Sequence, residues 1–236
     1  MNNNTLLFYG KNILKEIIKS KRFAIKKIYT NDIEKNKLTN LQNYYKIEIV
    51  TKQKLFQLVQ NKHHQNIVIE VESYPYQKLN LEKKENLSKV YIIFDSIQDP
   101  QNLGAALRNC YCFGFDNIIL QTNNSVLITS AVMKTSAGAA AYMNIYPVNN
   151  LNSIIQKFKN YSYKIYSIDV NGTEIINTTK IEYPCLIIFG SEDKGVRYNF
   201  LRISDKIIRI PINENFNSLN LSSSVAIILY KIKNFN

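Results

Sequence analysis

The sequence predicts an α/β fold built on a mostly parallel sheet. Segments rich in apolar β-branched residues alternate along the chain with segments of helical periodicity, which is the pattern of strands connected by helices. In the second part of the chain the strand segments are apolar throughout, as expected for a sheet that is covered on both faces. With 236 residues and 45% hydrophobic side chains, the chain can bury a sizeable core in one or two domains.

The first part of the chain, residues 1–73, predicts a small α/β domain of its own. Apolar residues recur at helical spacing after Gly10, and short apolar runs separate the helical segments. The predicted helices cover residues 10–20 and 51–61, and the predicted strands cover residues 25–30, 47–50 and 67–71. Residues 74–89 contain Pro75 and a run of charged residues, so we expect a linker there.

The second part, residues 90–236, predicts the larger domain. Its predicted strands cover residues 90–95, 117–121, 165–169, 185–190 and 207–210. Its predicted helices cover residues 103–113, 129–142, 151–161 and 218–233. In a parallel sheet of this kind, ligands bind outside the carboxyl ends of the strands. We therefore searched the loops that follow the strands for chemistry.

The charge of the chain is high and uneven. The formal net charge is +12, and residues 1–73 carry +7 of it, whereas residues 90–236 carry +3. A basic surface attracts the phosphate backbone of a nucleic acid, since binding releases condensed counterions. The densest basic cluster consists of Lys21, Arg22, Lys26 and Lys27, and we expect it to contact RNA.

Several classes of protein are excluded by the composition. No apolar run approaches the roughly 18 residues of a membrane span, and the first residues do not form a signal peptide, so no membrane partner is expected. Three cysteines are too few for a disulfide framework, which favours the cytoplasm. No cluster of metal ligands is visible, and no metal site is predicted.

Three loops, each after a predicted strand, carry candidate functional residues. The first contains Asn102 and leads into a helix bearing Arg108, although a helix cap and an ion pair would also explain these two residues. The second contains Gly190, Glu192 and Gly195. Its glycines allow the backbone to approach a ligand closely, but the loop matches no phosphate-binding motif. The third contains Ser218 and Asn220, either of which could also cap the closing helix.

Taken together, the three loops resemble the three motifs of the SpoU/TrmH branch of the SPOUT RNA methyltransferases. The matching residues are Asp99-Pro100-x-Asn102-Leu103-Gly104-Ala105 with Arg108, Gly190-x-Glu192-x-x-Gly195, and Ile210-Pro211 followed by Ser218-Leu219-Asn220. Lys134-Thr135-Ser136-Ala137-Gly138-Ala139 is similar to a further helix of the family. In the first part, Tyr9-Gly10-Lys11-Asn12 and His64-Gln65-Asn66-Ile67 resemble the L30e-like substrate-binding domain of bacterial enzymes that 2′-O-methylate a guanosine of large-subunit (23S-type) ribosomal RNA.

The resemblance implies a fold and an activity. It implies a Rossmann-like sheet whose C-terminal region forms a trefoil knot, preceded by an L30e-like domain at residues 1–73. It also implies a homodimer that transfers a methyl group from S-adenosylmethionine to a ribose 2′-hydroxyl of RNA. By position in the motifs, the cofactor would contact Ile168, Gly190, Ile210 and Leu219, and the catalytic residues would be Asn102, Arg108, Glu192, Ser218 and Asn220.

The RNA target is less closely determined than the reaction. Ribosomal RNA is favoured by the first domain, whereas residues 221–226, after Asn220, are similar to those of some transfer-RNA members of the family. A transfer-RNA methyltransferase and a non-catalytic RNA-binding factor for ribosome assembly therefore stay open as alternatives. The role of Arg108 is also open, since an arginine is a poor base but an effective phosphate ligand.

Overall fold

The computed structural model describes residues 5–82, 85, 87–213, 215 and 218–234. It divides the chain into two compact units. The smaller unit contains the described residues up to Pro75 together with Ile128–Tyr142, and the larger unit contains those of Tyr76–Leu127 and Met143–Asn236. None of the helices in the described part of the chain is long and apolar enough to cross a membrane.

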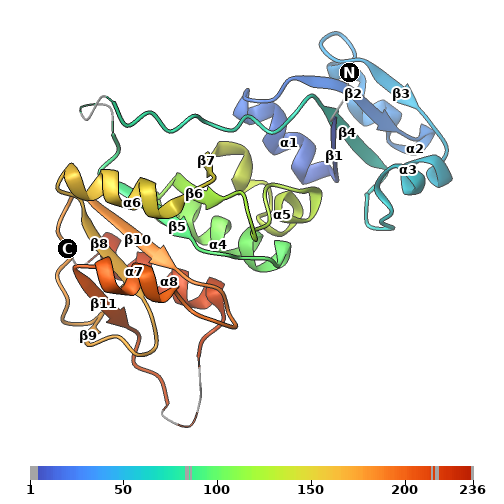
Figure 1. Cartoon of the computed structure of the whole chain (residues 1–236). Coiled ribbons are helices and arrows are strands. Elements are labelled where there is room, and N and C mark those ends of the chain that lie inside the picture. The colour runs from blue at the N-terminus through green and yellow to red at the C-terminus, as the bar shows by residue number, and fades with distance from the viewer. Residues whose placement is uncertain (1–4, 83–84, 86, 214, 216–217, 235–236) are drawn as a thin grey trace. The chain divides into compact units, whose positions relative to one another are not determined.

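The smaller unit is built on a four-stranded sheet in the order β1-β4-β2-β3, seen in Figure 1. Strand β4 pairs antiparallel with β1 and β2, whereas β2 and β3 are parallel. Its elements are β1 (Leu6–Tyr9), α1 (Lys11–Ser20), β2 (Ile25–Thr30), α2 (Asp32–Lys35), η1 (Asn36–Leu41), β3 (Ile47–Ile49), α3 (Lys52–Val59), β4 (Ile67–Val71), α5 (Ser130–Thr135) and η3 (Ala139–Tyr142). The strands and helices expected in residues 10–71 are present, and β1, α2 and η1 were not predicted.

One helix that was expected in the second part of the chain lies in this unit instead and is interrupted. A single helix was predicted over residues 129–142, but α5 ends at Thr135 and η3 begins at Ala139. Between them, Ala137 and Gly138 both have positive φ, of 53° and 87°. A Cβ at Gly138 would lie 2.8 Å from the Cβ and Cγ of Glu16 in α1. The close approach of α1 therefore requires a glycine at a position where the helical pattern gives no sign of a break.

The larger unit contains a sheet of seven parallel strands in the order β7-β6-β5-β10-β8-β11-β9. Its elements are β5 (Val90–Phe94), α4 (Pro100–Phe113), β6 (Asn117–Gln121), β7 (Asn144–Val148), α6 (Leu151–Asn160), β8 (Lys164–Ile168), β9 (Glu174–Ile175), β10 (Cys185–Phe189), α7 (Tyr198–Ile203), β11 (Lys206–Arg209) and α8 (Leu221–Asn234). The structure confirms the predicted α/β class and the parallel sheet; β7, β9 and α7 were not predicted.

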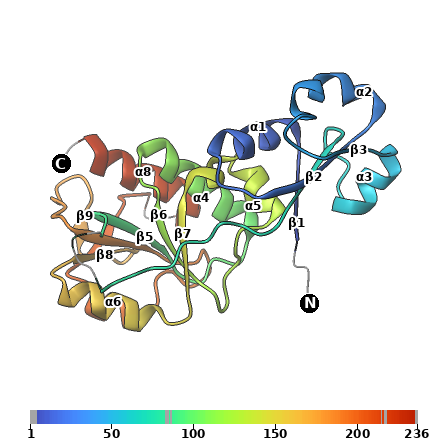
Figure 2. The ribbon, with the colours of Figure 1, turned by 90° about the horizontal axis from the view of Figure 1, so that it is seen from above.

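Helices cover both faces of this sheet. Figure 2 shows α6 on one face and α4 with α8 on the other. Leu151, Ile155 and Phe158 of α6 join Phe200 of α7 in a buried cluster with alternate residues of the central strands. The cluster also contains Leu81, so part of the segment expected to be a linker packs on the larger unit. Burial on both faces explains why the strand segments are apolar throughout.

The order of the strands differs from their order in the sequence. Strand β10 lies between β5 and β8, and β11 lies between β8 and β9, so both late strands insert between strands that precede them. This arrangement agrees with a knotted C-terminal region, although the trefoil knot itself stays a prediction. The insertion brings the loops after β8, β10 and β11 to one edge of the sheet, because the carboxyl ends of parallel strands lie side by side.

Candidate active site

The loop after β10 brings its own two ends together. Gly190 and Gly195 approach so closely that a Cβ at Gly190 would lie 2.0 Å from the carbonyl carbon of Gly195. Gly195 itself has a φ of 63°, and its amide donates a hydrogen bond of 2.9 Å to the carbonyl of Ser191. We call residues 190–196 the glycine loop. Its shape depends on backbone contacts that a side chain at Gly190 would prevent.

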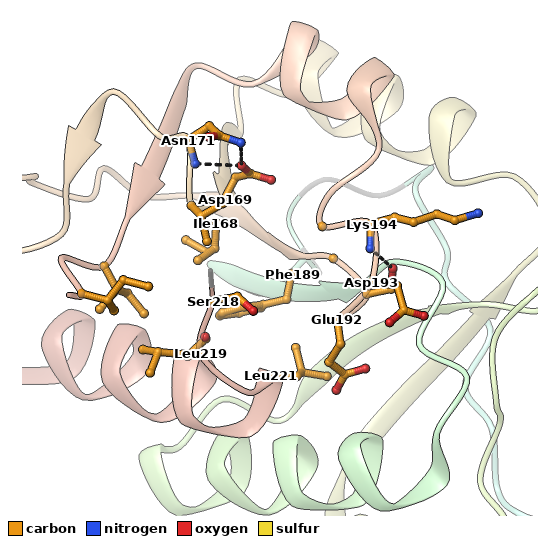
Figure 3. A pocket seen from close by; sticks show the side chains of 17 residues that line it. Ile168, Asp169, Asn171, Phe189, Glu192, Asp193, Lys194, Ser218, Leu219 and Leu221 are labelled. Atoms are coloured by element: carbon orange, nitrogen blue, oxygen red, sulfur yellow. Dashed lines mark hydrogen bonds between the residues drawn. The ribbon is translucent and has the colours of Figure 1, made fainter. Parts of the chain in front are cut away.

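The glycine loop forms one wall of a pocket of about 330 Å³ at the carboxyl ends of β8, β10 and β11 (Figure 3). All four residues expected to contact the cofactor line this pocket, and so do Glu192 and Ser218. The lining residues are Ile168, Asp169, Val170, Asn171, Phe189, Gly190, Ser191, Glu192, Asp193, Lys194, Gly195, Ile210, Ile212, Ser218, Leu219, Leu221 and Ser224. The structure thus gathers residues of the second and third motifs, together with the loop after β8, around one cavity.

The lining of the pocket is apolar in part and carries more acidic than basic groups. Ile168, Phe189 and Leu219 supply apolar surface. The acidic residues Asp169, Glu192 and Asp193 outnumber the single lysine, Lys194. Asp169 was not predicted; one of its oxygens, Oδ1, accepts hydrogen bonds from the backbone and side chain of Asn171, seen in Figure 3. Such a cavity suits a ligand that combines an apolar ring with a positive charge.

Beside the pocket, Asn102, Glu192 and Asn220 form a hydrogen-bonded group, which we call the Asn102 cluster. The side-chain amide of Asn220 donates to Oδ1 of Asn102 at 3.2 Å, and Asn102 donates to the carboxylate of Glu192. Asn220 also accepts the backbone N–H of Ser222 at 2.8 Å, as a helix-capping residue does. The predicted closing helix consequently begins at Leu221 instead of residue 218.

Helix α4 begins earlier than predicted, at Pro100, with Asp99 as its capping residue. The side chain of Asp99 accepts the backbone N–H of Gln101 at 2.9 Å. Asn102 therefore lies in the first turn of α4, and its amide is available for the Asn102 cluster. The alternative in which Asn102 caps the helix does not apply.

Burial and nearby charge perturb Glu192. Burial raises the pKa of its carboxyl group, and the neighbouring carboxylates of Asp99 and Asp193 raise it further. Hydrogen bonds from its own backbone N–H and from Asn102 act in the opposite direction. A carboxyl group with a raised pKa beside a cavity is typical of functional sites.

Arg108 does not join the Asn102 cluster. It lies six residues after Asn102 on α4, about 9 Å further along the helix axis. Its side chain is exposed, and within the described part of the chain it forms no hydrogen bond or ion pair. The alternative in which Arg108 pairs with a nearby acid is not what the structure shows, and the guanidinium is free to meet a ligand.

An ion pair between a buried aspartate and an exposed arginine beside the glycine loop was not predicted. Asp95, which follows β5, is 1% exposed, and its Oδ1 lies 2.7 Å from Nη2 of Arg197. Arg197 follows the glycine loop directly and also donates to Oε1 of Gln121. Arg197 is one of only five arginines in the chain, but no spacing in the sequence links it to Asp95.

The four basic residues expected to contact RNA all lie in the smaller unit and differ in their surroundings. Lys21 and Lys26 are exposed, whereas Arg22 is half-buried. Lys27 is 2.8 Å from a carboxylate oxygen of Glu48 and lies 5.2 Å from the ring centre of Tyr29. Of the four, Lys27 is therefore the least available to a phosphate.

Comparison with known proteins agrees with this geometry. Residues 89–230 match the model of the SpoU rRNA Methylase family, and residues 7–77 match a domain described as RNA 2′-O ribose methyltransferase substrate binding. An "Uncharacterized tRNA/rRNA methyltransferase" of Borreliella burgdorferi is 34% identical over 86% of this chain and 92% of its own length. A "Putative TrmH family tRNA/rRNA methyltransferase" of Staphylococcus haemolyticus is 30% identical over 96% of this chain and 94% of its own.

Solved structures share the fold at low sequence identity. An rRNA methyltransferase from Sinorhizobium meliloti with bound AdoMet has a TM-score of 0.81 at 19% identity, covering 97% of this chain and 86% of that one. The SpoU methyltransferase AviRb from Streptomyces viridochromogenes, in complex with the cofactor AdoMet, has a TM-score of 0.83 at 15% identity, covering 97% and 89%. The family model spans more than half of the chain, and the matched segment contains the pocket and the Asn102 cluster. This chain therefore belongs to the SpoU rRNA methylase family and is an RNA methyltransferase.

Proposed function

We propose that this enzyme uses S-adenosylmethionine to methylate the 2′-hydroxyl of a guanosine ribose in large-subunit ribosomal RNA. The observation that carries the proposal is the pocket of about 330 Å³ beside the Asn102 cluster, because a cavity of this lining suits the cofactor and the adjacent polar groups suit a hydroxyl. The match of residues 7–77 to a 2′-O ribose methyltransferase substrate-binding domain supports the 2′-O position. An rRNA substrate implies action in the cytoplasm.

The pocket fits the cofactor in shape and charge. S-adenosylmethionine supplies, when bound, a methyl group on a positively charged sulfur that is already a good leaving group. Ile168, Ile210 and Leu219 offer apolar surface to an adenine ring. Asp169 and Glu192 offer negative charge to the cationic end of such a ligand. Gly190 leaves the backbone of the glycine loop open to the cavity.

The remaining residues act on the RNA. Asn102 and Asn220 present amide groups that position the ribose hydroxyl, and Glu192 fixes the orientation of Asn102. Ser218 lies at the rim of the pocket, where it can contact the same ribose. The guanidinium of Arg108 binds negative charge, and the adjacent RNA phosphate suits its two parallel N–H groups.

A homodimer is part of the proposal. Helices α4 and α8 pack together, and the rings of Phe113 and Tyr230 are 6.1 Å apart. On these helices Tyr111, Ile227 and Tyr230 remain 41%, 41% and 52% exposed. Exposed large apolar side chains on two helices that pack together are typical of an interface between proteins. A second copy of the chain would cover this surface.

One substitution tests the role of Arg108. Replacing Arg108 by alanine should abolish methyl transfer and leave thermal unfolding unchanged, because the side chain is exposed and makes no contact within the described chain. Arg108→Lys should restore little, since lysine cannot form the bidentate contact. Methyl transfer to total RNA from cells that lack the gene provides the assay, and full activity of Arg108→Ala would refute the assignment.

The RNA target is tested by mapping ribose methylation on ribosomal and transfer RNA with and without the gene. We expect the loss of one guanosine mark in large-subunit ribosomal RNA. A transfer-RNA target is the second candidate, favoured by the sequence of residues 221–226, which begins helix α8. Loss of a transfer-RNA mark would establish that target instead, and no loss in either RNA would contradict both assignments.

A further inference from the structure

The buried carboxylate of Asp95 is held by an unusual number of contacts. Its Oδ2 accepts hydrogen bonds from Nε of Arg197 at 2.9 Å and from the backbone N–H of the same residue at 3.3 Å. Its Oδ1 lies 2.7 Å from Nη2 of Arg197 and accepts the hydroxyl of Ser96 at 3.1 Å. A buried charge is costly unless it is paired and hydrogen-bonded, and these contacts supply that pairing for the Asp95 carboxylate.

Asp95 contacts both ends of the glycine loop. Its backbone N–H donates to the carbonyl of Phe189 at 2.9 Å, immediately before the loop begins. Its side chain binds Arg197, immediately after the loop ends. Arg197 is held in turn by Gln121 and by the ring of Phe200, 4.5 Å from the guanidinium carbon.

Within the loop the internal contacts are few. Ser191 accepts the N–H of Gly195 at 2.9 Å, and its hydroxyl accepts the N–H of Lys194 at 3.4 Å. These bonds shape the loop but do not attach it to the sheet. Val196 packs in the buried cluster of the sheet, and Asn102 interacts with Glu192 from outside the loop. The position of Glu192 relative to the pocket therefore depends on these contacts and on where the two ends of the loop are fixed.

We propose that Asp95 and Arg197 are positioning residues that hold the glycine loop, and Glu192 upon it, in the geometry that binds the cofactor. Neither residue lines the pocket. They act through the backbone at the ends of the loop. The inference rests on the proposed function, because it takes the pocket as the site of S-adenosylmethionine.

Two single variants and their combination test the proposal in the full-length protein. Asp95→Asn keeps the backbone bond to Phe189 but removes the charge, and Arg197→Gln removes the guanidinium from a side chain that is 42% exposed. Asp205→Asn is the control: its Oδ2 accepts the N–H of Ile165 at 2.8 Å, at the amino ends of β8 and β11 and away from the glycine loop. Each protein is examined by hydrogen–deuterium exchange, by calorimetric titration with S-adenosylmethionine, and by steady-state methyl transfer.

Loss of a charge-assisted hydrogen bond should weaken S-adenosylmethionine binding by about tenfold or more in both single variants. Exchange of the amides of residues 190–197 should accelerate, while exchange in β5 and β8 stays at the wild-type rate. The double variant should be no worse than the poorer single variant, since the two residues act as one unit. KM for S-adenosylmethionine should rise more than kcat falls, and Asp205→Asn should match the wild type throughout.

Two outcomes would overturn the proposal. Wild-type affinity and wild-type loop exchange in both single variants would show that the pair does not position the loop. Faster exchange throughout the sheet would show a purely structural role. Should Asp95→Asn not fold, Arg197→Gln alone decides between these outcomes. Failure of the proposed function would be seen separately, as absence of S-adenosylmethionine binding by the wild type, and the exchange data would still report on the loop.

Discussion

Substituting Gly190 by alanine perturbs the glycine loop where its two ends lie closest together. The added Cβ would lie 2.0 Å from the carbonyl carbon of Gly195, 2.1 Å from its oxygen and 2.2 Å from the nitrogen of Val196. Ordinary contacts begin at 3.4 Å, so the backbone at Gly195 must move by about 1.4 Å. The neighbouring atoms belong to the backbone and cannot rotate away as the end of a flexible side chain would.

This displacement should lower the free energy of unfolding by about 3 kcal/mol, the upper end of the range for overpacked interiors, because no side chain can move to accommodate it. It also moves Glu192 and the pocket wall, so S-adenosylmethionine binding should weaken by at least about 100-fold, the equivalent of nearly 3 kcal/mol. Gly114→Ala is the control. Gly114 has a φ of 84°, but the nearest atom to its added Cβ, Nζ of Lys233, is 3.9 Å away. That variant should be destabilised only by backbone strain, by about 1–2 kcal/mol, and should bind the cofactor with wild-type affinity.

The two variants separate steric overlap from backbone strain. Native-state hydrogen exchange of the β10 amides reports the stability of the larger unit alone, which unfolding of the whole two-unit chain would not. Calorimetry gives the affinity for S-adenosylmethionine. Wild-type affinity in Gly190→Ala, or an equal loss of affinity in Gly114→Ala, would refute the argument that the backbone contact at Gly190 shapes the pocket.

Three further predictions concern the rest of the molecule. Lys26→Ala should weaken RNA binding, measured as a salt-dependent dissociation constant, more than Lys27→Ala does, because Lys27 is already paired with a carboxylate. Burial lowers the pKa of His64 in the folded protein below the ordinary histidine value of about 6.5. The folded state should therefore lose stability as the pH falls from about 6.5 through the lower folded-state pKa, because the unfolded chain binds the proton more readily. Thermal unfolding at pH 5 and 8 checks this, and His64→Asn should remove the difference. Ile227→Asp should convert a dimer into monomers in light scattering, whereas an unchanged mass would exclude α8 from the interface.

Much of the fold follows from local pattern. The strands of the larger sheet are continuous apolar runs, and each predicted one lies within a few residues of its observed position. The elements that escaped prediction are short or irregular: β9 has two residues, and α2 is a single turn. Such segments bury too few side chains for a periodicity to develop, and their conformation depends on neighbours distant in the sequence.

The boundaries of helices were wrong where side chains make unexpected contacts. Helix α4, capped by Asp99, begins three residues before its predicted start, and α8, capped by Asn220, begins three residues after its predicted start. In both cases the capping residue belongs to a motif that was interpreted as functional. Asn220 in fact has two roles, since its oxygen caps α8 while its amide group donates to Asn102.

The candidate site was predictable as a set of residues but not as an arrangement. Gly190, Ile210 and Leu219 were chosen by resemblance to motifs, and the structure places them around one cavity. Nothing in local periodicity indicates that β10 inserts between β5 and β8, yet this insertion brings Asp95 beside the glycine loop. A buried carboxylate and its distant arginine have no shared spacing, so the pair becomes visible only when strand order is known.

The same strand order explains why the site can be both rigid and open. Each pocket loop begins at the end of a buried strand, so its first residue is fixed by the sheet. The glycine loop is also fixed immediately after its last residue, through Arg197 and Asp95, while the middle of the loop makes few contacts. A loop held at both ends and free between them can admit a cofactor without losing its geometry. We therefore expect binding of S-adenosylmethionine to slow hydrogen exchange at residues 191–195 more than at Arg197, whose amide the Asp95 carboxylate already holds.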